Sequence, residues 1–403
     1  MTEEIKNRIE QVKSGQISVG YKKTEVGIVP EEWKSTVLSK IFLFKNGLNK
    51  EKEAFGKGTP IVNYIDVYKK RGLRAGDLKG KVELSDKEIK NYNVQKGDVF
   101  FTRTSETVDE IGMTSVILDE VKDTVFSGFI LRARPFNKHI CTEYNQYCYS
   151  SDLMRNEIRK KSSCTTRALT NGVFLGQVNI NLPSFEEQQR IADILMKWDE
   201  AISLQEKLIE KLEEQKKALM RRLLTPKEGG RKVKLQDICE INKGVQINNE
   251  DLMDNATFKM MNGGISESGY LDKYNRQANT IIISEGGNSC GYVNYIEEKF
   301  WCGGHCYSLD NVMIDELYLF CYLKNAQNEI MRLRVGSGLP NIQKHSLLKF
   351  VIHYPVDDNH MKRISRYLFS VEKNIEFHKQ KLTLFKQQQK ALMQLLLTGI
   401  VRV

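Results

Sequence analysis

The sequence predicts an α+β protein in which two β-rich domains are separated by a long antiparallel coiled coil, arranged as an internal repeat with pseudo-twofold symmetry. Three observations lead to this fold class. The chain has 403 residues, which is too long for one ordinary core and indicates at least two domains. Segments near its middle and near its end repeat each other. Each of these segments carries a heptad pattern of apolar residues that continues over four heptads.

Composition places the chain among folded proteins. Hydrophobic residues make up 40% and charged residues 28%, and no stretch approaches about eighteen consecutive apolar residues, so we expect no membrane span. The first residues, MTEEIKNRIEQVKSG, have a mixed-charge helical pattern without the apolar core of a secretion signal. Eight cysteines are scattered through the chain, which indicates free thiols in a reducing, cytoplasmic location.

Positive charge is concentrated in two parts of the chain. The net charge is +10; residues 21–183 hold 27 basic and 20 acidic groups, and residues 358–403 hold 9 basic and 3 acidic groups. Residues 231–357 are slightly acidic by comparison. This distribution favours a polyanionic partner, attracted mainly by the first domain and the C-terminal segment.

An internal repeat with a spacing of 173 residues organises the chain. The matching segments are EEQKKALMRRLLTP at 213–226 with KQQQKALMQLLLTG at 386–399, QQRIADIL at 188–195 with MKRISRYL at 361–368, and, one residue out of register, VNINLP at 178–183 with FVIHYP at 350–355. A looser match joins Lys45-Asn46-Gly47 to Asn242-Lys243-Gly244. The chain is therefore two copies of one plan, in which a variable block is followed by a strand, a proline and a long helix.

The two long helices carry matching heptad seams. Polar interruptions fall at matching places, since Gln205 corresponds to His378 and Lys216 to Gln389. A seam of this length predicts a coiled coil between the two copies. The residues expected at this coiled-coil or subunit interface are Leu195, Trp198, Ile202, Ile209, Leu212, Leu219, Leu368, Val371, Ile375, Leu382, Phe385 and Leu392.

Connectivity predicts the direction of the second helix. The first helix delivers the chain to the second block, so a second helix that pairs with it has to run back, antiparallel. The helical N-terminal segment is then expected to pack near the C-terminus. The predicted boundaries are 1–20 for the N-terminal helical segment, 21–183 for the first β-rich domain, 184–225 for the central spacer helix, 226–357 for the second β-rich domain and 358–403 for the C-terminal spacer helix.

Runs of β-branched and aromatic residues, bounded by Gly and Pro, predict the strands of both blocks. They lie at 97–104, 113–118, 125–134 and 176–183 in the first block, and at 279–284, 291–296 and 299–309 in the second. Short helices are expected at 141–160 and at 314–332, each just before the last loop and strand of its block.

Motifs for bond chemistry are missing from the sequence. The seven prolines are never adjacent, so the Asn/Asp-Pro-Pro-aromatic loop of base-methylating sites is absent. There is no G-x-x-x-x-G-K-[ST] phosphate loop, and no clear acidic cluster followed by E-x-K of the nuclease type. We therefore expect a protein that is not an enzyme and that binds no cofactor.

Cys290, Cys302, His305 and Cys306 form the nearest candidate for a metal site, because zinc takes four ligands of these types. Their spacing matches no standard zinc knuckle, and Cys302 and Cys306 are expected to lie on either side of a strand instead of a tight turn. We expect packed small thiols with a loop histidine and no metal.

Turn-rich basic loops are the better functional candidates. Hydroxyl, guanidinium and amide groups on loops that contain glycine suit phosphate contacts and base-edge readout in a DNA groove. Two of these loops, 162–172 and 335–345, occupy equivalent places in the two copies, just before the strand that leads to a long helix. The predicted DNA-binding residues are Lys57, Thr59, Asn63, Arg103, Thr104, Ser105, Thr165, Thr166, Arg167, Ser337, Asn341 and Lys344.

The helix motifs resemble those of the specificity (S) subunit of type I restriction–modification systems. The resemblance is carried by LPSFEEQQRIADIL at 182–195, by the end of the same helix at 213–226, and by the degenerate second copy from YPVDDNHMKRISRYL to the C-terminus. GDVFFTRT at 97–104 also resembles the target-recognition strand of that family. The second copy departs from the family pattern at Asn359-His360, where Glu-Gln is usual.

The resemblance implies a non-catalytic subunit with two target recognition domains. Each domain would read one half of a bipartite, asymmetric sequence in double-stranded DNA, with an unread gap set by the helical spacer. Two methyltransferase subunits, which bring S-adenosylmethionine, would dock on the helices, and restriction subunits that use ATP and Mg would join further out. Two other classes remain open, namely a coiled-coil adaptor that binds only protein and a zinc-dependent enzyme that uses residues 290–306.

Overall fold

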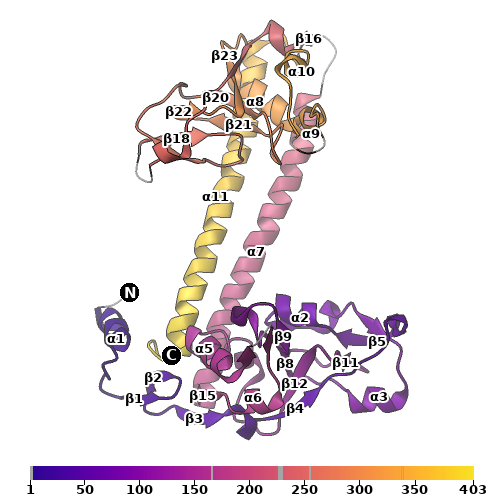
Figure 1. The fold of residues 1–403 in the computed structure, drawn as a ribbon, viewed down its shortest axis with the longest axis vertical. Coiled ribbons are helices and arrows are strands. Elements are labelled where there is room, and N and C mark those ends of the chain that lie inside the picture. Colours follow the sequence, from indigo (N-terminus) through magenta and orange to yellow (C-terminus); the bar gives the residue numbers. More distant parts are fainter. Residues whose placement is uncertain (1–2, 165–166, 226–229, 254–255, 337, 339) are drawn as a thin grey trace. The chain divides into compact units, whose positions relative to one another are not determined.

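The protein is described by a computed structural model that covers residues 3–164, 167–225, 230–253, 256–336, 338 and 340–403. Its residues divide into two compact units. Unit 1 comprises Met1–Ser203 and Thr383–Val403, and unit 2 comprises Leu204–Leu382. The unit boundaries fall inside the long helices α7 (Phe185–Leu224) and α11 (Asp358–Leu397), so each of these helices belongs partly to unit 1 and partly to unit 2 (Figure 1).

The main sheet of unit 1 has five strands, β4 (Phe42–Asn46), β6 (Gly72–Leu73), β8 (Val99–Thr102), β10 (Thr114–Ile117) and β12 (Ile130–Pro135). They lie in the order β4-β12-β8-β10-β6; β6 pairs with β10 in parallel and the other neighbours are antiparallel. The central strand β8 reads VFFT and all four of its residues are buried. A continuous apolar run of this kind needs cover on both faces of its sheet.

Each face of the sheet has its own cover. On one face lies a three-stranded sheet of β5 (Phe55–Val62), β7 (Lys81–Val82) and β11 (Val125–Phe126), where the rings of Phe100 and Phe126 are 5.4 Å apart. On the other face Phe101 packs edge-on against Tyr149, at 5.3 Å, within a core that also holds Leu195 of α7. The helices of unit 1, apart from the two long ones, are α1 (Glu3–Lys13), α2 (Tyr64–Lys69), α3 (Asp86–Asn91), α4 (Thr142–Asn145), α5 (Asp152–Lys161) and α6 (Gly172–Gly176).

Smaller sheets complete unit 1. They are formed by β1 (Tyr21–Thr24) with β2 (Gly27–Pro30), by β3 (Lys34–Val37) with β15 (Asn179–Leu182), and by β9 (Thr104–Ser105), β14 (Ala168–Leu169) and β13 (Ser163–Cys164). Two residues separate the end of β15 from the start of α7, so the β3–β15 pair leads directly into this helix.

Unit 2 repeats this plan. Its main sheet contains β17 (Glu240–Lys243), β20 (Thr280–Ser284), β21 (Val293–Ile296) and β23 (Cys306–Asp310). Their order, β17-β23-β20-β21, matches the order β4-β12-β8-β10 of unit 1. The remaining elements are β16 (Arg231–Lys234), β18 (Phe258–Met261), β19 (Gly269–Leu271), β22 (Phe300–Cys302), β24 (Val351–Tyr354), α8 (Glu316–Asn325), α9 (Gln327–Met331) and α10 (Lys344–Leu348).

The smaller sheets of the two units also correspond. β18 pairs in parallel with β22 and antiparallel with β19, as β5 pairs with β11 and β7. β16 and β24 form an antiparallel pair before α11, as β3 and β15 do before α7. This agreement in strand order and direction confirms the predicted α+β fold class and its internal repeat.

The long helices pack against each other within each unit, and the contacts obey the 173-residue repeat. In unit 1, Gln389 Nε2 donates a hydrogen bond to Asp199 Oδ1 (2.7 Å). In unit 2 the equivalent residues, Lys216 and Glu372, form an ion pair. In unit 2 Gln205 also meets His378, its own equivalent, with Gln205 Nε2 2.8 Å from His378 Nδ1. Because each contact and its counterpart exchange the two helices, the pairing has the predicted pseudo-twofold character.

The N-terminal helix lies against the C-terminal segment within unit 1. Arg8 Nη1 of α1 donates to the carbonyl oxygen of Ile400 (2.7 Å), and the Tyr21 hydroxyl donates to that of Gly399 (2.7 Å). Arg402 closes the same region through an ion pair with Glu187 of α7 (2.6 Å). These contacts agree with the packing expected for the N-terminal segment.

Three predicted strands are interrupted, and each interruption is a correction to the sequence analysis. Residues 97–104 divide at Arg103 into β8 and β9, and residues 125–134 divide at 127–129 into β11 and β12. Residues 299–309 divide at 303–305 into β22 and β23. At 127–129 the dipeptide Ser127-Gly128, and at 303–305 the dipeptide Gly303-Gly304, allow a tight turn where the apolar pattern alone predicts a continuous strand.

In the part of the chain that the structure describes, every helix is too short or too polar to span a membrane.

Candidate nucleic-acid interface

Three segments of unit 1 meet at the end of β8, and we call this meeting point, formed by Arg103, Gly128, Phe129 and Thr170, junction 1. The backbone N–H of Arg103 donates to the carbonyl oxygen of Phe129 (3.3 Å), and the carbonyl oxygen of Arg103 accepts from the N–H of Thr170 (2.9 Å). Arg103 Nη1 donates to the carbonyl oxygen of Gly128 (2.9 Å). The end of β8, the turn before β12 and the loop after β14 are therefore held together.

Most of the residues predicted in two of the loops come together beside junction 1. Thr104 and Ser105 form β9, which pairs with β14, so the strand end and the hydroxyl-rich loop share one small sheet. Ser105 is buried, and its Oγ accepts from the N–H of Thr107 (3.2 Å). Arg167 is exposed between β13 and β14. Thr165 and Thr166, from the same loop, lie outside the described residues.

The three residues predicted along β5 have local partners. Lys57 forms an exposed ion pair with Glu83 (3.1 Å), and Thr59 is half-buried opposite Val82. The N–H of Asn63 donates to Asp66 Oδ2 (2.9 Å) and so begins α2 as a helix cap does. Asn63 directly follows Val62, whose carbonyl oxygen accepts from the N–H of Ser127 (3.0 Å), so it borders the turn of junction 1.

Unit 2 has an equivalent meeting point, which we call junction 2 and which is formed by Glu285, Gly304, His305 and Ile342. The N–H of Glu285 donates to the carbonyl oxygen of His305 (2.9 Å), and the N–H of Ile342 donates to that of Glu285 (2.8 Å). The order of segments is the same as in junction 1, namely the end of β20, the turn before β23 and the loop after α9.

The residues predicted in the second unit lie on that last loop. Asn341 forms isolated β-bridges with Gly286 and with Val335, which reproduces the three-stranded arrangement β9-β14-β13 of unit 1. Lys344 is exposed at the first position of α10. Ser337 lies outside the described residues.

The two junctions differ in charge. Glu285 stands where unit 1 has Arg103; it is 7% exposed, and its Oε1 accepts from Lys243 Nζ (2.7 Å) and from the Tyr307 hydroxyl (2.9 Å). Burial, together with Glu285, raises the pKa of Tyr307 above its usual value, so the phenol stays a donor. A basic residue at the strand end is therefore not a shared feature of the two units.

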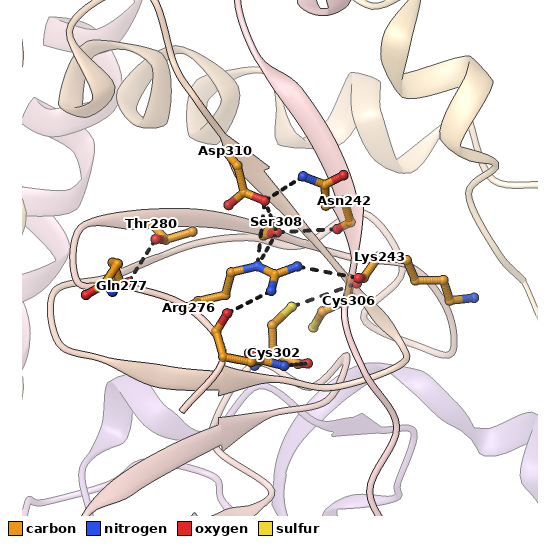
Figure 2. Close-up of polar contacts among 10 residues, drawn as sticks. Asn242, Lys243, Arg276, Gln277, Thr280, Cys302, Cys306, Ser308 and Asp310 are labelled. Carbon is orange, nitrogen blue, oxygen red and sulfur yellow. Dashed lines mark hydrogen bonds and ion pairs between the residues drawn. The ribbon is translucent and has the colours of Figure 1, made fainter. Parts of the chain in front are cut away.

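A polar network anchors the sheet edge next to junction 2. Figure 2 shows Arg276 beside the paired strands β17 and β23: its Nε donates to Ser308 Oγ (2.7 Å) and lies 3.6 Å from Asp310 Oδ2. Asn242 Nδ2 donates to the same Asp310 oxygen (2.8 Å). Because the arginine is largely buried and every one of these groups has a partner, the network fixes the edge strand β17 against β23, the strand that follows the turn of His305.

The cysteines near this turn have backbone partners. Cys302 and Cys306 lie on either side of the tight turn at 303–305, not of a strand, which corrects the sequence analysis; the N–H of Cys306 donates to the carbonyl oxygen of Gly303 (3.1 Å). Cys306 Sγ accepts from the N–H of Gly263 (3.0 Å), and Cys290 Sγ donates to the carbonyl oxygen of Glu285 (3.1 Å). Burial raises the pKa of the Cys290 thiol. Within the described ranges no group of three or more His, Cys, Asp or Glu side chains is placed to hold a metal ion.

The residues predicted for the helix seam are buried or half-buried. Leu195, Ile202, Ile209, Leu368 and Ile375 are 0 to 9% exposed. The others, half-buried, are Trp198, Leu212, Leu219, Val371, Leu382, Phe385 and Leu392. Leu204 and Phe377, which are equivalent residues of the repeat, lie on the outer side of the helices and are each 59% exposed.

Sequence reasoning missed Phe129, Glu285 and His305. Phe129 stands within an apolar run and reads as a core residue, and His305 was assigned to the cysteine cluster. The match between Lys45-Asn46-Gly47 and Asn242-Lys243-Gly244 is the signal that could have paired the two junctions, since both segments lie beside the turns in question.

Comparison with known proteins adds the family. The model of the type I restriction modification DNA specificity domain matches residues 30–214 and 227–387. A putative type I restriction enzyme MjaX specificity subunit of Methanocaldococcus jannaschii is 24% identical, over 95% of this chain and 97% of its own. The MjaVIII specificity subunit of the same organism is 23% identical over 93% and 94%. The crystal structure of a type I restriction-modification system S subunit from M. genitalium shares the fold, with a TM-score of 0.64, 17% identity and coverage of 90% of this chain and 96% of that one.

Proposed function

Because the chain belongs to the type I restriction modification DNA specificity family, and is thus a non-catalytic subunit that recognises DNA, we propose that its two units read the two halves of one bipartite target. The observation that carries this proposal is the pair of junctions. The same backbone arrangement presents Arg103 and Phe129 in one unit and Glu285 and His305 in the other. A shared frame with different side chains suits two readers of different sequences.

We propose DNA contacts for the predicted loop residues. In unit 1 these are the residues beside junction 1 and along β5, and in unit 2 the loop at 335–345. Arg167 and Lys344 suit phosphate contacts, since each is an exposed cation, Arg167 on a loop and Lys344 at the start of α10. Arg103 suits a base edge, because one guanidinium nitrogen is already fixed on Gly128.

The partner subunits would dock on the long helices. Leu204 and Phe377 are exposed apolar side chains at equivalent positions of the repeat, and Leu208, 40% exposed, lies one turn from Leu204. Exposed apolar side chains at two equivalent positions suit two copies of one partner, which supports two methyltransferase subunits. S-adenosylmethionine would be bound by these subunits, and ATP and Mg by restriction subunits that join the complex, all in the cytoplasm.

Methylome sequencing of cells that carry the complete system, with and without this chain, tests the proposal. We expect one two-part methylated motif that requires the chain. The same motif in cells without the chain would show that another protein supplies the sequence recognition. A coiled-coil adaptor that binds only protein would leave the assembled complex without sequence-specific DNA binding.

A further inference from the structure

We propose that Phe129 and His305 are specificity-determining residues that contact base edges, Phe129 in one half of the DNA target and His305 in the other. The inference rests on the proposed function, since it names the residues through which each unit would read its half. It concerns two residues that lie at the same place in the repeat and that differ completely in chemistry.

The equivalence of the two residues follows from backbone hydrogen bonds. Five bonds of junction 1 have counterparts in junction 2. In unit 1 these bonds run from Leu48 N to Phe126 O, from Ser127 N to Val62 O, from Ile130 N to Ser127 O, from Arg103 N to Phe129 O and from Thr170 N to Arg103 O. Their counterparts in unit 2, in the same order, run from Val245 N to Cys302 O, from Gly303 N to Met261 O, from Cys306 N to Gly303 O, from Glu285 N to His305 O and from Ile342 N to Glu285 O. Phe129 and His305 therefore occupy one structural position.

Each turn packs closely against a neighbouring segment, with a glycine at the point of contact. A Cβ on Gly128 would lie 2.0 Å from Asn49 Oδ1, and one on Gly47 would lie 2.0 Å from the carbonyl oxygen of Ser127. In unit 2 a Cβ on Gly244 would lie 2.2 Å from the carbonyl oxygen of Gly303. Since no side chain fits at these places, each turn is fixed between two segments and presents one residue outward.

The presented side chains are left for an external partner. Phe129 is 68% exposed and His305 is exposed as well. A single exposed phenylalanine has little meaning by itself. Here, however, the exposed residue stands on a fixed turn, at a position repeated in the second unit, beside the loops that carry the predicted DNA contacts.

Two buried polar side-chain atoms at junction 1 have no hydrogen-bond partner among the described residues. Thr170 is 4% exposed and its Oγ1 has no hydrogen-bond partner among the described residues; the same holds for Arg103 Nε. Buried polar atoms are nearly always paired, so these two atoms require a bound water or a change of side-chain position when DNA binds.

The chemistry of the two side chains predicts different readout. Phe129 has no hydrogen-bonding group and can discriminate only by apolar contact, as with the methyl group of thymine, or by insertion at a base step. His305 can donate or accept a hydrogen bond at a base edge. A turn of the same geometry would therefore select for shape and methyl groups in one half-site and for polar base edges in the other.

The experiment measures binding of the assembled complex, with its methyltransferase subunits, to duplexes in which each position of the methylated motif is changed in turn. For Phe129→Ala we expect discrimination at one position of one half-site to fall on the order of tenfold, with the other half-site unchanged. For His305→Ala we expect the reverse. Phe136→Ala is the matched control, since Phe136 is 53% exposed at the opposite end of β12, and it should leave both half-sites unchanged.

The remaining outcomes separate this inference from the proposed function. A motif that depends on the chain, together with unchanged discrimination in both alanine variants, overturns the inference and leaves the proposed function standing. Equal weakening on all sequences also overturns it, since that is the behaviour of a phosphate contact. A motif that does not depend on the chain overturns the proposed function itself. Phe129→Leu, which keeps an apolar side chain, should retain discrimination and carries the test if the alanine variant is unstable.

Discussion

Arg103 combines two roles in one side chain. Its Nη1 supports the turn of Phe129 by donating to the carbonyl oxygen of Gly128, while its Nε has no hydrogen-bond partner among the described residues. In unit 2 the turn has no such arginine, and Glu285 at the equivalent place is engaged by Lys243 and Tyr307. The side chains at this one position thus carry opposite charges in the two units, while the backbone hydrogen bonds around it are the same.

Replacing Arg103 by Ala should weaken recognition of one half-site by about 1–3 kcal/mol and relax its sequence preference, because a base-contacting guanidinium is lost. Binding of the assembled complex to matched and mismatched duplexes measures this. Arg167→Ala is the comparison: a phosphate contact should weaken binding to all sequences and reduce the salt dependence. If both variants kept the affinity and the motif of the unaltered chain, neither arginine would contact DNA.

Lys324 gives unit 2 a pH-dependent stability. Burial lowers the pKa of its amine to about 8, although the side chain donates to the carbonyl oxygen of Val293 (2.7 Å). In the unfolded chain the pKa of this amine is about 10.4. Between these values the unfolded state binds more protons, so the contribution of Lys324 to the free energy of unfolding rises with pH.

The free energy of unfolding of the unaltered chain should therefore increase relative to that of Lys324→Met between about pH 8 and pH 10. Denaturant unfolding of both proteins at the two pH values gives the difference. Using the difference removes the opposite trend from the buried cysteines and tyrosines, which the two proteins share. A difference that is independent of pH would show that the amine is not shifted by burial.

The paired helices show what a sequence pattern can and cannot predict at the level of elements. Heptad periodicity predicts α7 and α11 well, because a long amphipathic helix depends on residues close in sequence. The pattern does not predict the strand interruptions at 127–129 and 303–305, because the flanking apolar residues continue the strand pattern across each turn. Junctions 1 and 2 were only half predicted: the loop positions of Arg103 and Asn341 follow from local composition, but the neighbours that fix Phe129 and His305 come from distant segments.

The polar pair of Gln205 and His378 is expected to fix the register of the helices in unit 2. Gln205 Nε2 contacts His378 Nδ1 and also donates to the carbonyl oxygen of His378 (3.0 Å), in a seam that is otherwise mainly apolar. Gln205→Leu alone should cost about 1–3 kcal/mol, because it leaves the imidazole without its partner in a partly buried place.

A double-mutant cycle with His378→Leu measures the coupling within this pair. The double leucine variant should recover most of the loss, since two apolar side chains can pack where one polar group was left alone. Denaturant unfolding of the four proteins gives the coupling free energy. If the effects of the two single changes simply added, the pair would carry no register information.

For the whole molecule, we propose that the repeat lets one chain serve two copies of a partner and two different DNA sequences. The helices repeat their polar contacts, as Asp199 with Gln389 and Glu372 with Lys216 show, whereas the junctions repeat only their backbone. We expect this pattern if the helices bind two copies of one partner and the junctions bind different DNA sequences.

A negative charge introduced at Leu204 or Phe377 tests the proposed docking of partner subunits on the long helices. Leu204→Glu and Phe377→Glu should each remove one methyltransferase subunit from the complex, and the double variant should remove both, because a carboxylate cannot be buried unpaired in an apolar contact. The mass of the assembled complex reports the number of subunits. Met313→Glu is the control, since Met313 is 78% exposed on a loop of unit 2 and is not part of either long helix. Two subunits retained in the double variant would place the docking surface elsewhere.

We propose that each unit reads its own half of the DNA target. Replacing residues 21–183 by the corresponding domain of a relative with a different motif is the decisive experiment, with methylation-motif sequencing as the measurement. We predict that one half of the motif changes to that of the donor, while the other half is kept. A motif with both halves altered, or with neither altered, would contradict independent reading by the two units.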